Sequence, residues 1–229
     1  MPHFCRITSF LAFVFLAAPA LAERPYTPEI TVERWVDTHD VRADGSDRET
    51  TEYVFRIETA QGVSDQGAQR ISYRSGVDDV ESIEASTIKA DGTVINIPAS
   101  AIRTQDEDSD GGATHFSDTK YKVIVFPAVE VGGRVHVRAT VNHRSTPFPK
   151  FFADTALLSP EWNWEDWEMN ISIPASLALY VEQRGIKGSQ ESAKDGVNHY
   201  HFSYKSASCR ISSDWTPLIS SEWDHPISG

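Results

Sequence analysis

Short runs in which hydrophobic and polar residues alternate recur along most of this sequence. The clearest signal lies in 116–141, where Val123 and Val125 precede Pro127 at a spacing of two. After Gly132-Gly133 the same spacing returns at Val135, Val137, Ala139 and Val141. A period of two is typical of strands with one buried face. This stretch therefore predicts two antiparallel strands joined as a hairpin.

Two further pairs of runs predict hairpins in the N-terminal half. Residues 29–39 alternate, 43–47 carry a turn signal, and 51–59 place Tyr53, Phe55 and Ile57 on one face. Residues 82–89 and 94–97 flank Asp91-Gly92, a strong signal for a tight turn. Between these pairs, 61–67 predict a loop and 70–74 a short strand. Residues 99–102 predict a single helical turn.

The C-terminal half gives weaker patterns. We expect strands at 151–158 and 198–204, a strand or a turn of helix at 177–184, and a loop at 187–195. Residues 161–173 carry three tryptophans and end at Pro174. No segment shows sustained helical periodicity, and turn signals recur at short intervals. The prediction is an all-β fold, an antiparallel β-sandwich-like module with two packed units at 23–143 and 144–205. Residues 206–229 predict an irregular tail.

The first 22 residues have the features of a signal peptide. Arg6 supplies a positive charge, 7–18 are mostly apolar, and Ala20-Leu21-Ala22 fits a cleavage site before Glu23. The apolar run is shorter than the roughly 20 residues that a membrane-spanning helix needs. We therefore expect a periplasmic or secreted protein, with no membrane insertion once the signal is removed.

Composition narrows the range of partners. The chain has 21 Lys and Arg against 33 Asp and Glu, a net charge of −12. Loss of the signal removes Arg6 and no acid, so the net charge becomes −13. Such a surface disfavours nucleic acid and anionic lipid. Cys209 is the only cysteine outside the signal, which leaves no intramolecular disulfide.

Several short motifs in the central part of the chain are those of a known family. They occupy 82–89, 91–94, Pro98, 101–102, 116–119 and 123–132. On these motifs the chain resembles an exported bacterial family of domains of unknown function, usually found N-terminal to a transglutaminase-like domain. The resemblance extends over about 26–204. It implies a β-sandwich module and gives no catalytic residue to carry over.

The chain departs from such proteins after the module, where a catalytic domain would follow. A transglutaminase-like site needs a thiolate at a helix N-terminus, with a histidine and an acid from later strands. Cys209 is followed by His225 and a few acids, without a helical pattern. We therefore expect no enzyme activity. A stand-alone module, a truncated gene and a frameshifted end all remain open.

Two clusters of polar residues could bind a metal ion. Asp106, Asp108, Asp110 and Gly111 have the spacing of the start of a calcium loop, but Ser117 stands where the twelfth-position acid belongs. A solvated acidic loop is the favoured interpretation, with bound Ca²⁺ as the alternative; no other cofactor is expected. His199 and His201 would share one strand face and could begin a zinc site, but no third ligand is evident.

Trp162, Trp164 and Trp167 lie among acidic residues, a combination that can hold a sugar ring. The same indoles could instead seal the junction between two β units, which is the commoner outcome. Glu161 and Glu165 as a glycosidase pair is a weaker hypothesis, because two acids alone do not fix the separation that catalysis needs. The tryptophan cluster therefore remains a candidate ligand site beside a packing role.

The sequence as a whole favours a non-enzymatic exported module that binds or scaffolds at the cell envelope. Its expected partner is a protein or a cell-wall component, and the oligomeric state is left open. Two alternatives remain, a glycan-binding or glycan-cleaving protein and a fragment of a longer transglutaminase-like enzyme.

Overall fold

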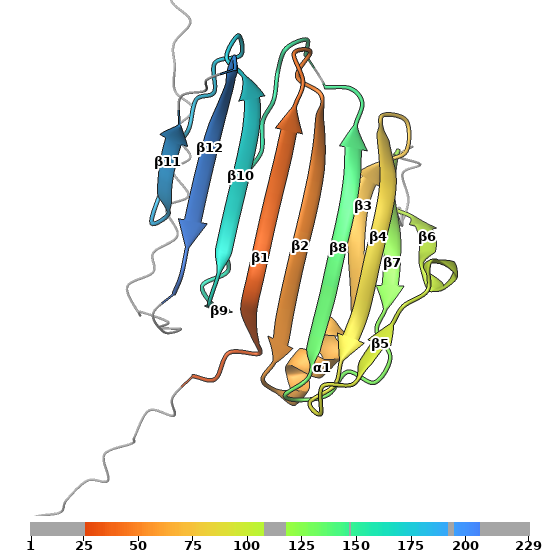
Figure 1. Cartoon of the computed structure of the whole chain (residues 1–229). Coiled ribbons are helices and arrows are strands. Elements are labelled where there is room, and N and C mark those ends of the chain that lie inside the picture. The colour runs from red at the N-terminus through yellow and green to blue at the C-terminus, as the bar shows by residue number, and fades with distance from the viewer. Residues whose placement is uncertain (1–25, 108–117, 147, 192–194, 207–229) are drawn as a thin grey trace, which may run out of the picture.

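The structure is a computed structural model that describes residues 26–107, 118–146, 148–191 and 195–206. These residues form two β-sheets and one short helix (Figure 1). The all-β fold class predicted from the sequence is confirmed. In the described ranges, no helix has the length and hydrophobicity to cross a membrane. The predicted signal peptide, the tail beyond residue 206 and Cys209 lie outside the described residues.

The large sheet contains nine strands in the order β11-β12-β10-β1-β2-β8-β4-β5, with β9 paired to β1. The strands are β1 (Ile30–Val41), β2 (Asp47–Ile57), β4 (Asp78–Ile88), β5 (Val94–Asn96), β8 (Arg134–His143), β9 (Asn163–Trp164), β10 (Trp167–Pro174), β11 (Lys187–Glu191) and β12 (Val197–Tyr204). Its longest strands, β1, β2, β4 and β8, lie next to one another around its centre, as Figure 1 shows.

The large sheet is mixed, because β1 pairs with β2 in antiparallel and with β10 in parallel orientation. Trp35 of β1 stands opposite Tyr53 of β2 on one side and Trp167 of β10 on the other. The sheet thus takes strands from both of the predicted units 23–143 and 144–205. The division at residue 143 itself stays a prediction.

The small sheet has three antiparallel strands in the order β3-β7-β6. They are β3 (Ala68–Arg74), β6 (Arg103–Asp106) and β7 (Thr119–Val125). The helix α1 (Ala60–Gln66) connects β2 to β3, and the 3-10 turn η1 (Ala99–Ala101) precedes β6. Figure 1 shows this sheet and α1 behind the large sheet. We call the face of the large sheet on this side the inner face.

The predicted hairpin within 116–141 is wrong. Its two strands exist, but β7 lies in the small sheet, whereas β8 lies in the large sheet between β2 and β4. Both edges of β8 are occupied, so it has no free edge for β7. The buried face of β7 also differs from the prediction, because Ile124 is fully buried and Val125 is 62% exposed.

The other two predicted hairpins are confirmed as β1–β2 and β4–β5, and the helical turn at 99–102 is confirmed as η1. Residues 61–67 were expected to be a loop but mostly form α1, whose first turn is capped by Thr59 Oγ1 accepting from Gly62 N (3.1 Å). Residues 151–158 and 177–184 contain no strand or helix. Within the predicted loop 187–195, β11 is a fully exposed edge strand, so it has no alternation of burial to detect.

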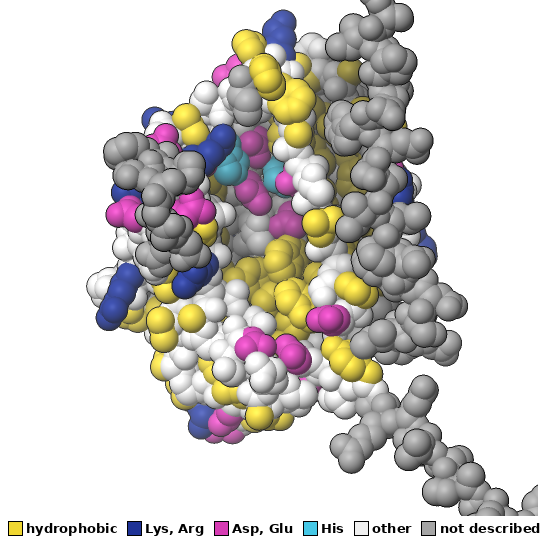
Figure 2. Space-filling view, turned by 180° about the vertical axis from the view of Figure 1, so that it is seen from behind, with side chains coloured by type: hydrophobic (Ala, Val, Ile, Leu, Met, Phe, Trp, Pro, Cys, Tyr) yellow, Lys and Arg dark blue, Asp and Glu magenta, His cyan; other side chains and the backbone are white. Residues whose placement is uncertain are grey.

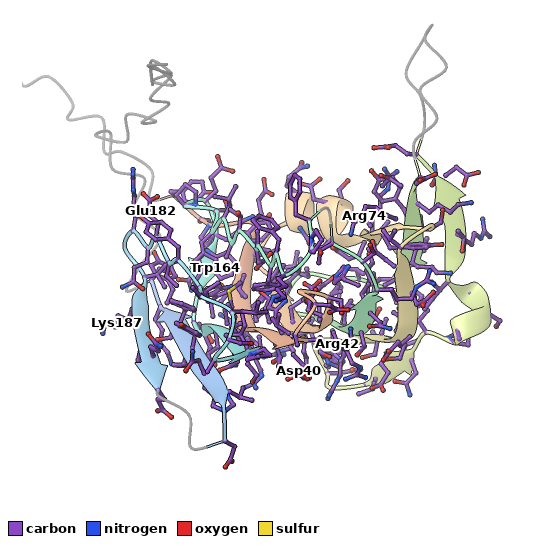
Figure 3. The ribbon with its side chains drawn as sticks, turned by 90° about the horizontal axis from the view of Figure 1, so that it is seen from above. Asp40, Arg42, Arg74, Trp164, Glu182 and Lys187 are labelled. Carbon is purple, nitrogen blue, oxygen red and sulfur yellow. The ribbon has the colours of Figure 1, made fainter. Side chains whose placement is uncertain are left out.

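The core lies on the inner face of the large sheet. Ile30, Val32, Phe55 and Val137 are almost fully buried there, together with Trp164. Figure 3, seen from above, places Trp164 on this covered side of the sheet and Asp40 on the open side. The two layers are therefore unequal. The small sheet and the irregular segments between β8 and β11 together form the second layer.

Candidate functional site

A hollow of about 630 Å³ opens on the inner face of the large sheet. Figure 2 views the molecule from behind and shows hydrophobic side chains in the hollowed region, with acidic and histidine side chains gathered toward one end. Strands β1, β2 and β8 form the floor of the hollow, α1 and β3 form one wall, and Trp162 contributes from the opposite side. The site thus combines a central sheet with two flanking segments that are distant in the sequence.

Aromatic rings make up much of the floor. The Tyr53 ring stacks on Trp35 and on Phe55, with centroid distances of 4.9 and 4.5 Å. Trp162 lies 5.7 Å from Phe55 and is half-buried. Pairing of β1 with β2 puts Trp35 directly opposite Tyr53, because inward-facing residues of neighbouring strands meet in rows. This floor offers apolar, polarisable surface to a ligand.

Acidic and histidine side chains gather at one end of this face, in what we call the acid–histidine cluster. It consists of Asp37, His39, Asp47, Glu49, Asp78 and His143. The strand register explains the clustering, because His39 lies opposite Glu49, and Asp47 and Asp78 both lie opposite His143. Glu49 and Thr51 also line the hollow, so the cluster is continuous with it.

His143 is held between two carboxylates. Its Nδ1 lies 2.9 Å from Asp78 Oδ1, and its Nε2 lies 3.0 Å from Glu49 Oε2. The hydrogen bond to Glu49 is the main cause that raises the pKa of His143 to about 9, against the opposing effect of burial. Since both ring nitrogens face carboxylates, the imidazole is doubly protonated at neutral pH.

The remaining members of the cluster are strongly coupled to one another. Burial disfavours the charge on His39, but its hydrogen bond to Asp47 (3.1 Å) and nearby carboxylates raise its pKa overall. Burial similarly opposes ionisation of Glu49, yet the pKa of Glu49 is lowered by the hydrogen bond to His143 and by the charge on His39. The Nε2 of His39 has no hydrogen-bond partner, and its nearest carboxylate oxygen belongs to Asp154 at 3.6 Å.

Asp37 behaves in the opposite way. Burial raises its pKa to about 6, although Thr51 Oγ1 and Trp35 Nε1 each donate to its carboxylate at 2.8 Å. At Asp37, desolvation therefore outweighs the hydrogen bonds. In the described part of the chain, no three His, Cys, Asp or Glu side chains are arranged to hold a metal ion.

Among the described residues, the predicted metal ligands form no group that could hold a metal ion. Asp106 lies in β6 and pairs with Lys120 Nζ (2.9 Å), whereas Asp108 and Asp110 fall outside the described residues. His199 and His201 lie on β12, where Nδ1 of His199 is 3.1 Å from Ser172 Oγ and Nδ1 of His201 is 2.9 Å from Asn170 Oδ1. The calcium hypothesis is thus untested at two of its three acids.

The three tryptophans have separate environments. Trp164 and Trp167 are 3% and 2% exposed and belong to the core, and Trp164 Nε1 donates to the Ser159 carbonyl (2.9 Å). Their indole faces are covered by protein, which supports the packing interpretation. Trp162 alone of the three lines the hollow.

The acid–histidine cluster was not predicted from the sequence, although a signal was present. The predicted inward face of β2 carries Tyr53, Phe55 and Ile57. Continuing the same period toward the start of the strand gives Thr51, Glu49 and Asp47. Three polar residues on the face that is apolar farther along are the unexpected feature.

Comparison with known proteins adds a family to this geometry. Residues 43–208 match the family described as "Domain of Unknown Function with solved-structure structure (DUF3857)". The chain belongs to the DUF3857 family. This confirms the part of the predicted resemblance that concerns a domain family of unknown function. No curated protein matches this DUF3857 chain in sequence.

Solved structures similar to this DUF3857 domain are longer proteins. One is a putative protease from Parabacteroides distasonis, with a TM-score of 0.70 and 18% sequence identity. The match covers 83% of this chain and 38% of the protease chain. Another is an M1 zinc metallopeptidase from Deinococcus radiodurans, with a TM-score of 0.36 and 10% identity; the match covers 77% of this chain and 39% of the metallopeptidase. A third is aminopeptidase A from Legionella pneumophila, with a TM-score of 0.38 and 4% identity; the match covers 81% of this chain and 22% of the aminopeptidase. This chain thus spans less than half the length of each. The first likeness shows a shared fold, and the two lower scores add nothing to it.

Proposed function

We propose that this DUF3857 domain is a non-enzymatic binding module of the cell envelope that holds part of a protein or of the cell wall in the hollow. The observation that carries the proposal is the hollow itself. Its volume of about 630 Å³ lies in the range of ligand pockets, and aromatic rings with a few polar groups are typical of their linings.

The way in which the cluster is bonded supports a binding role over catalysis. Asp78, His143 and Glu49 bond to one another in a chain, so both nitrogens of His143 are engaged by carboxylates. An imidazole held as a cation by two acids is a poor general base. We expect no turnover of peptide or peptidoglycan substrates by the purified chain. Turnover that is lost in Glu49→Gln would refute the non-enzymatic role.

Blocking the hollow tests the binding role directly. Ala68 is exposed on β3 and lines the hollow, so Ala68→Trp fills space without entering the core. Val94 is 55% exposed on β5 and does not line the hollow, which makes Val94→Trp the matched control. We expect calorimetric binding of soluble peptidoglycan fragments or of peptides to be lost in the first variant and kept in the second. Equal binding by both would place the ligand elsewhere.

A glycan ligand is the second candidate, because Trp162 is half-buried beside the hollow, with Glu49 and Asp65 among the other lining residues. Trp162→Ala should then abolish binding of a muramyl glycan lacking its peptide, while the protein stays folded. Trp164→Ala is not a suitable probe of binding, since removing a buried indole costs about 3–5 kcal/mol of stability.

Location in the envelope rests on residues 1–22 and is tested separately. N-terminal sequencing of the protein recovered from the producing bacterium should begin at Glu23. An N-terminus at residue 1 or 2 would rule out export by this signal.

The fragment alternative is supported by the partial coverage of the longer Parabacteroides protein. Reading the genomic DNA beyond the Gly229 codon tests it. A Cys-His-Asp domain there, in frame or shifted, would make this chain the N-terminal module of an enzyme.

A further inference from the structure

The wall of the hollow formed by β3 is the edge of a strand. β3 is the first strand of the small sheet and pairs on one side only, with β7. Five consecutive residues, from Ala68 to Ser72, line the hollow. A strand that presented one face would contribute every second residue. Consecutive lining therefore means that the free edge borders the hollow.

The alternation of hydrogen bonds along β3 identifies which of its backbone groups point toward the hollow. Phe126 N donates to Gly67 O and Ser75 N donates to Asp118 O, both at 2.9 Å. In an antiparallel pair every second residue exchanges bonds with the partner strand. The residues between these positions that bond to β7 are thus 69, 71 and 73. Ala68, Arg70 and Ser72 present their N–H and C=O groups to the hollow side, where no described strand pairs with them.

The two ends of this edge have different surroundings. Near its start, Tyr53 OH donates to Gln69 Oε1 at 3.5 Å, which places the aromatic floor beside the first residues of β3. At its end, Arg74 N donates to Asp78 Oδ2 (2.7 Å), and Asp78 continues through His143 to Glu49. The edge thus runs from the aromatic floor to the acid–histidine cluster.

Negative charge predominates at the cluster end. Asp37, Asp47, Glu49, Asp78 and Asp154 lie there, against His39, His143 and Arg74. Within the lining of the hollow, Glu49 and Asp65 are the acids and Arg70 is the one base. The guanidinium carbon of Arg70 lies 5.9 Å from the centroid of the Tyr121 ring, which belongs to the neighbouring strand β7. A cationic ligand group is therefore the electrostatic complement of this end.

We infer that the hollow binds an extended peptide segment that adds a strand to the free edge of β3, with an apolar side chain on the aromatic floor and a lysine or arginine at the acid–histidine cluster. The inference rests on the proposed binding function and names its ligand class. Main-chain bonds to an edge strand provide affinity, and alternate side chains provide specificity. Five residues of β3 extend over about 13 Å, so a segment of five to seven residues fits.

The ligand class is tested with a library of random heptapeptides displayed on phage and selected against the immobilised chain. Enriched peptides should carry Lys or Arg two residues from an aromatic or large aliphatic residue, since side chains two apart share a strand face. In a synthetic copy of the best peptide, Lys→Glu should weaken binding at least tenfold. N-methylation of successive amides should weaken it with a period of two, because only alternate N–H groups face β3.

Two proline substitutions test the edge on the protein side. Ser72→Pro removes an N–H that faces the hollow and spares the bonds to β7. Thr104→Pro is the matched control, since Thr104 occupies the equivalent outward position in β6 on the far edge of the small sheet. Binding should fall at least tenfold in the first variant only. If Ser72→Pro fails to fold, the N-methylated peptides on the unaltered chain provide the same test.

Failure of this inference can be distinguished from failure of the proposed function. Peptides that bind without a cation preference or without the period of two would overturn the strand addition, yet leave the hollow as a binding site if Ala68→Trp blocks them. The same holds if peptidoglycan fragments bind and no peptide is enriched. If neither class binds, both the inference and the proposed function are wrong.

Discussion

His143 of β8 links the two neighbouring strands β2 and β4 through Glu49 and Asp78, and its charge is expected to stabilise the fold. A pKa raised from 6.5 to about 9 stabilises the folded state fully below pH 6.5, and this contribution is lost as the pH rises through 9. We expect His143→Gln to lower the free energy of unfolding at pH 6 by at most about 3 kcal/mol and to have little effect near pH 10.

Urea unfolding across this pH range measures the effect. His39 also has a raised pKa and contributes with the same sign, so the informative quantity is the difference between the variant and the unaltered chain. His199→Gln is the control, because His199 lies outside the cluster and contacts Ser172 on an exposed surface. A pH-independent loss of stability in His143→Gln would mean that packing, and not charge, accounts for the role of His143.

Asp37 provides a second pH effect of opposite consequence. Its pKa of about 6 lies above the ordinary value of 3.8, so its burial begins to cost stability as the pH rises through 3.8, and the cost is complete above pH 6. We expect the unaltered chain to lose about 2 kcal/mol from this group as the pH rises from 4 to 6. A carboxyl signal of Asp37 that titrates near pH 4 in an NMR titration would contradict this assignment.

Single residues also show how far sequence reasoning reaches. The alternation in β2 was enough to locate the buried face through Tyr53 and Phe55. It could not reveal that Glu49 would meet His143, because these two residues are 94 positions apart in the sequence and are brought together only by the pairing of β2 with β8. Chemistry that depends on cross-strand neighbours is invisible until the strand order is known.

At the level of elements, the turn between β1 and β2 holds one border of the inner face in place. Gly45 has a φ of +93°, and a Cβ there would lie 2.6 Å from the backbone N and O of Phe151. Lys150 N donates to Asp44 O at 2.8 Å, so the same turn anchors the segment before β9. Gly45→Ala is expected to cost about 3 kcal/mol of unfolding free energy, from backbone strain and from the clash.

Gly92 in the β4–β5 turn is the matched control for that experiment. Its φ is +86°, yet nothing lies within 4 Å of the added Cβ. Gly92→Ala should therefore cost only about 1 kcal/mol, the conformational part alone. Equal losses in urea unfolding of both variants would show that the contact with Phe151 contributes nothing.

The same two turns explain which elements the sequence could predict. Both hairpins that were found have a glycine with positive φ in a short turn, and such turns leave the following strand beside the preceding one. The connection from β7 to β8 also contains a glycine with positive φ, Gly132, but it carries the chain from one sheet to the other. Alternation predicts that a strand exists, and it does not choose the partner.

At the level of the whole molecule, the parallel pairing of β1 with β10 joins the two halves of the sequence. β1 pairs with β2, which lies in the first half of the sequence, and with β10 and β9, which lie in the second half. The rings of Trp35 in β1 and Trp164 in β9 have centroids 6.1 Å apart, so the aromatic core contains residues from both sides of the predicted boundary at residue 143. No local pattern could predict this, because a parallel pair needs a long connection that leaves no turn signal.

This architecture leads us to expect one cooperative unfolding transition for the described domain. Calorimetry should give a ratio of calorimetric to van't Hoff enthalpy close to one, and tryptophan fluorescence and far-UV circular dichroism should report the same midpoint.

A fragment of residues 23–143 should fail to fold, because it would expose the edge of β1 that pairs with β10 and uncover the apolar inner face over Trp35 and Val32. If that fragment instead unfolds cooperatively by itself, the boundary at residue 143 separates two domains. The β1–β10 pairing would then be an interface between them, and ligands held over Trp35 and Trp162 would bridge two independently folded units.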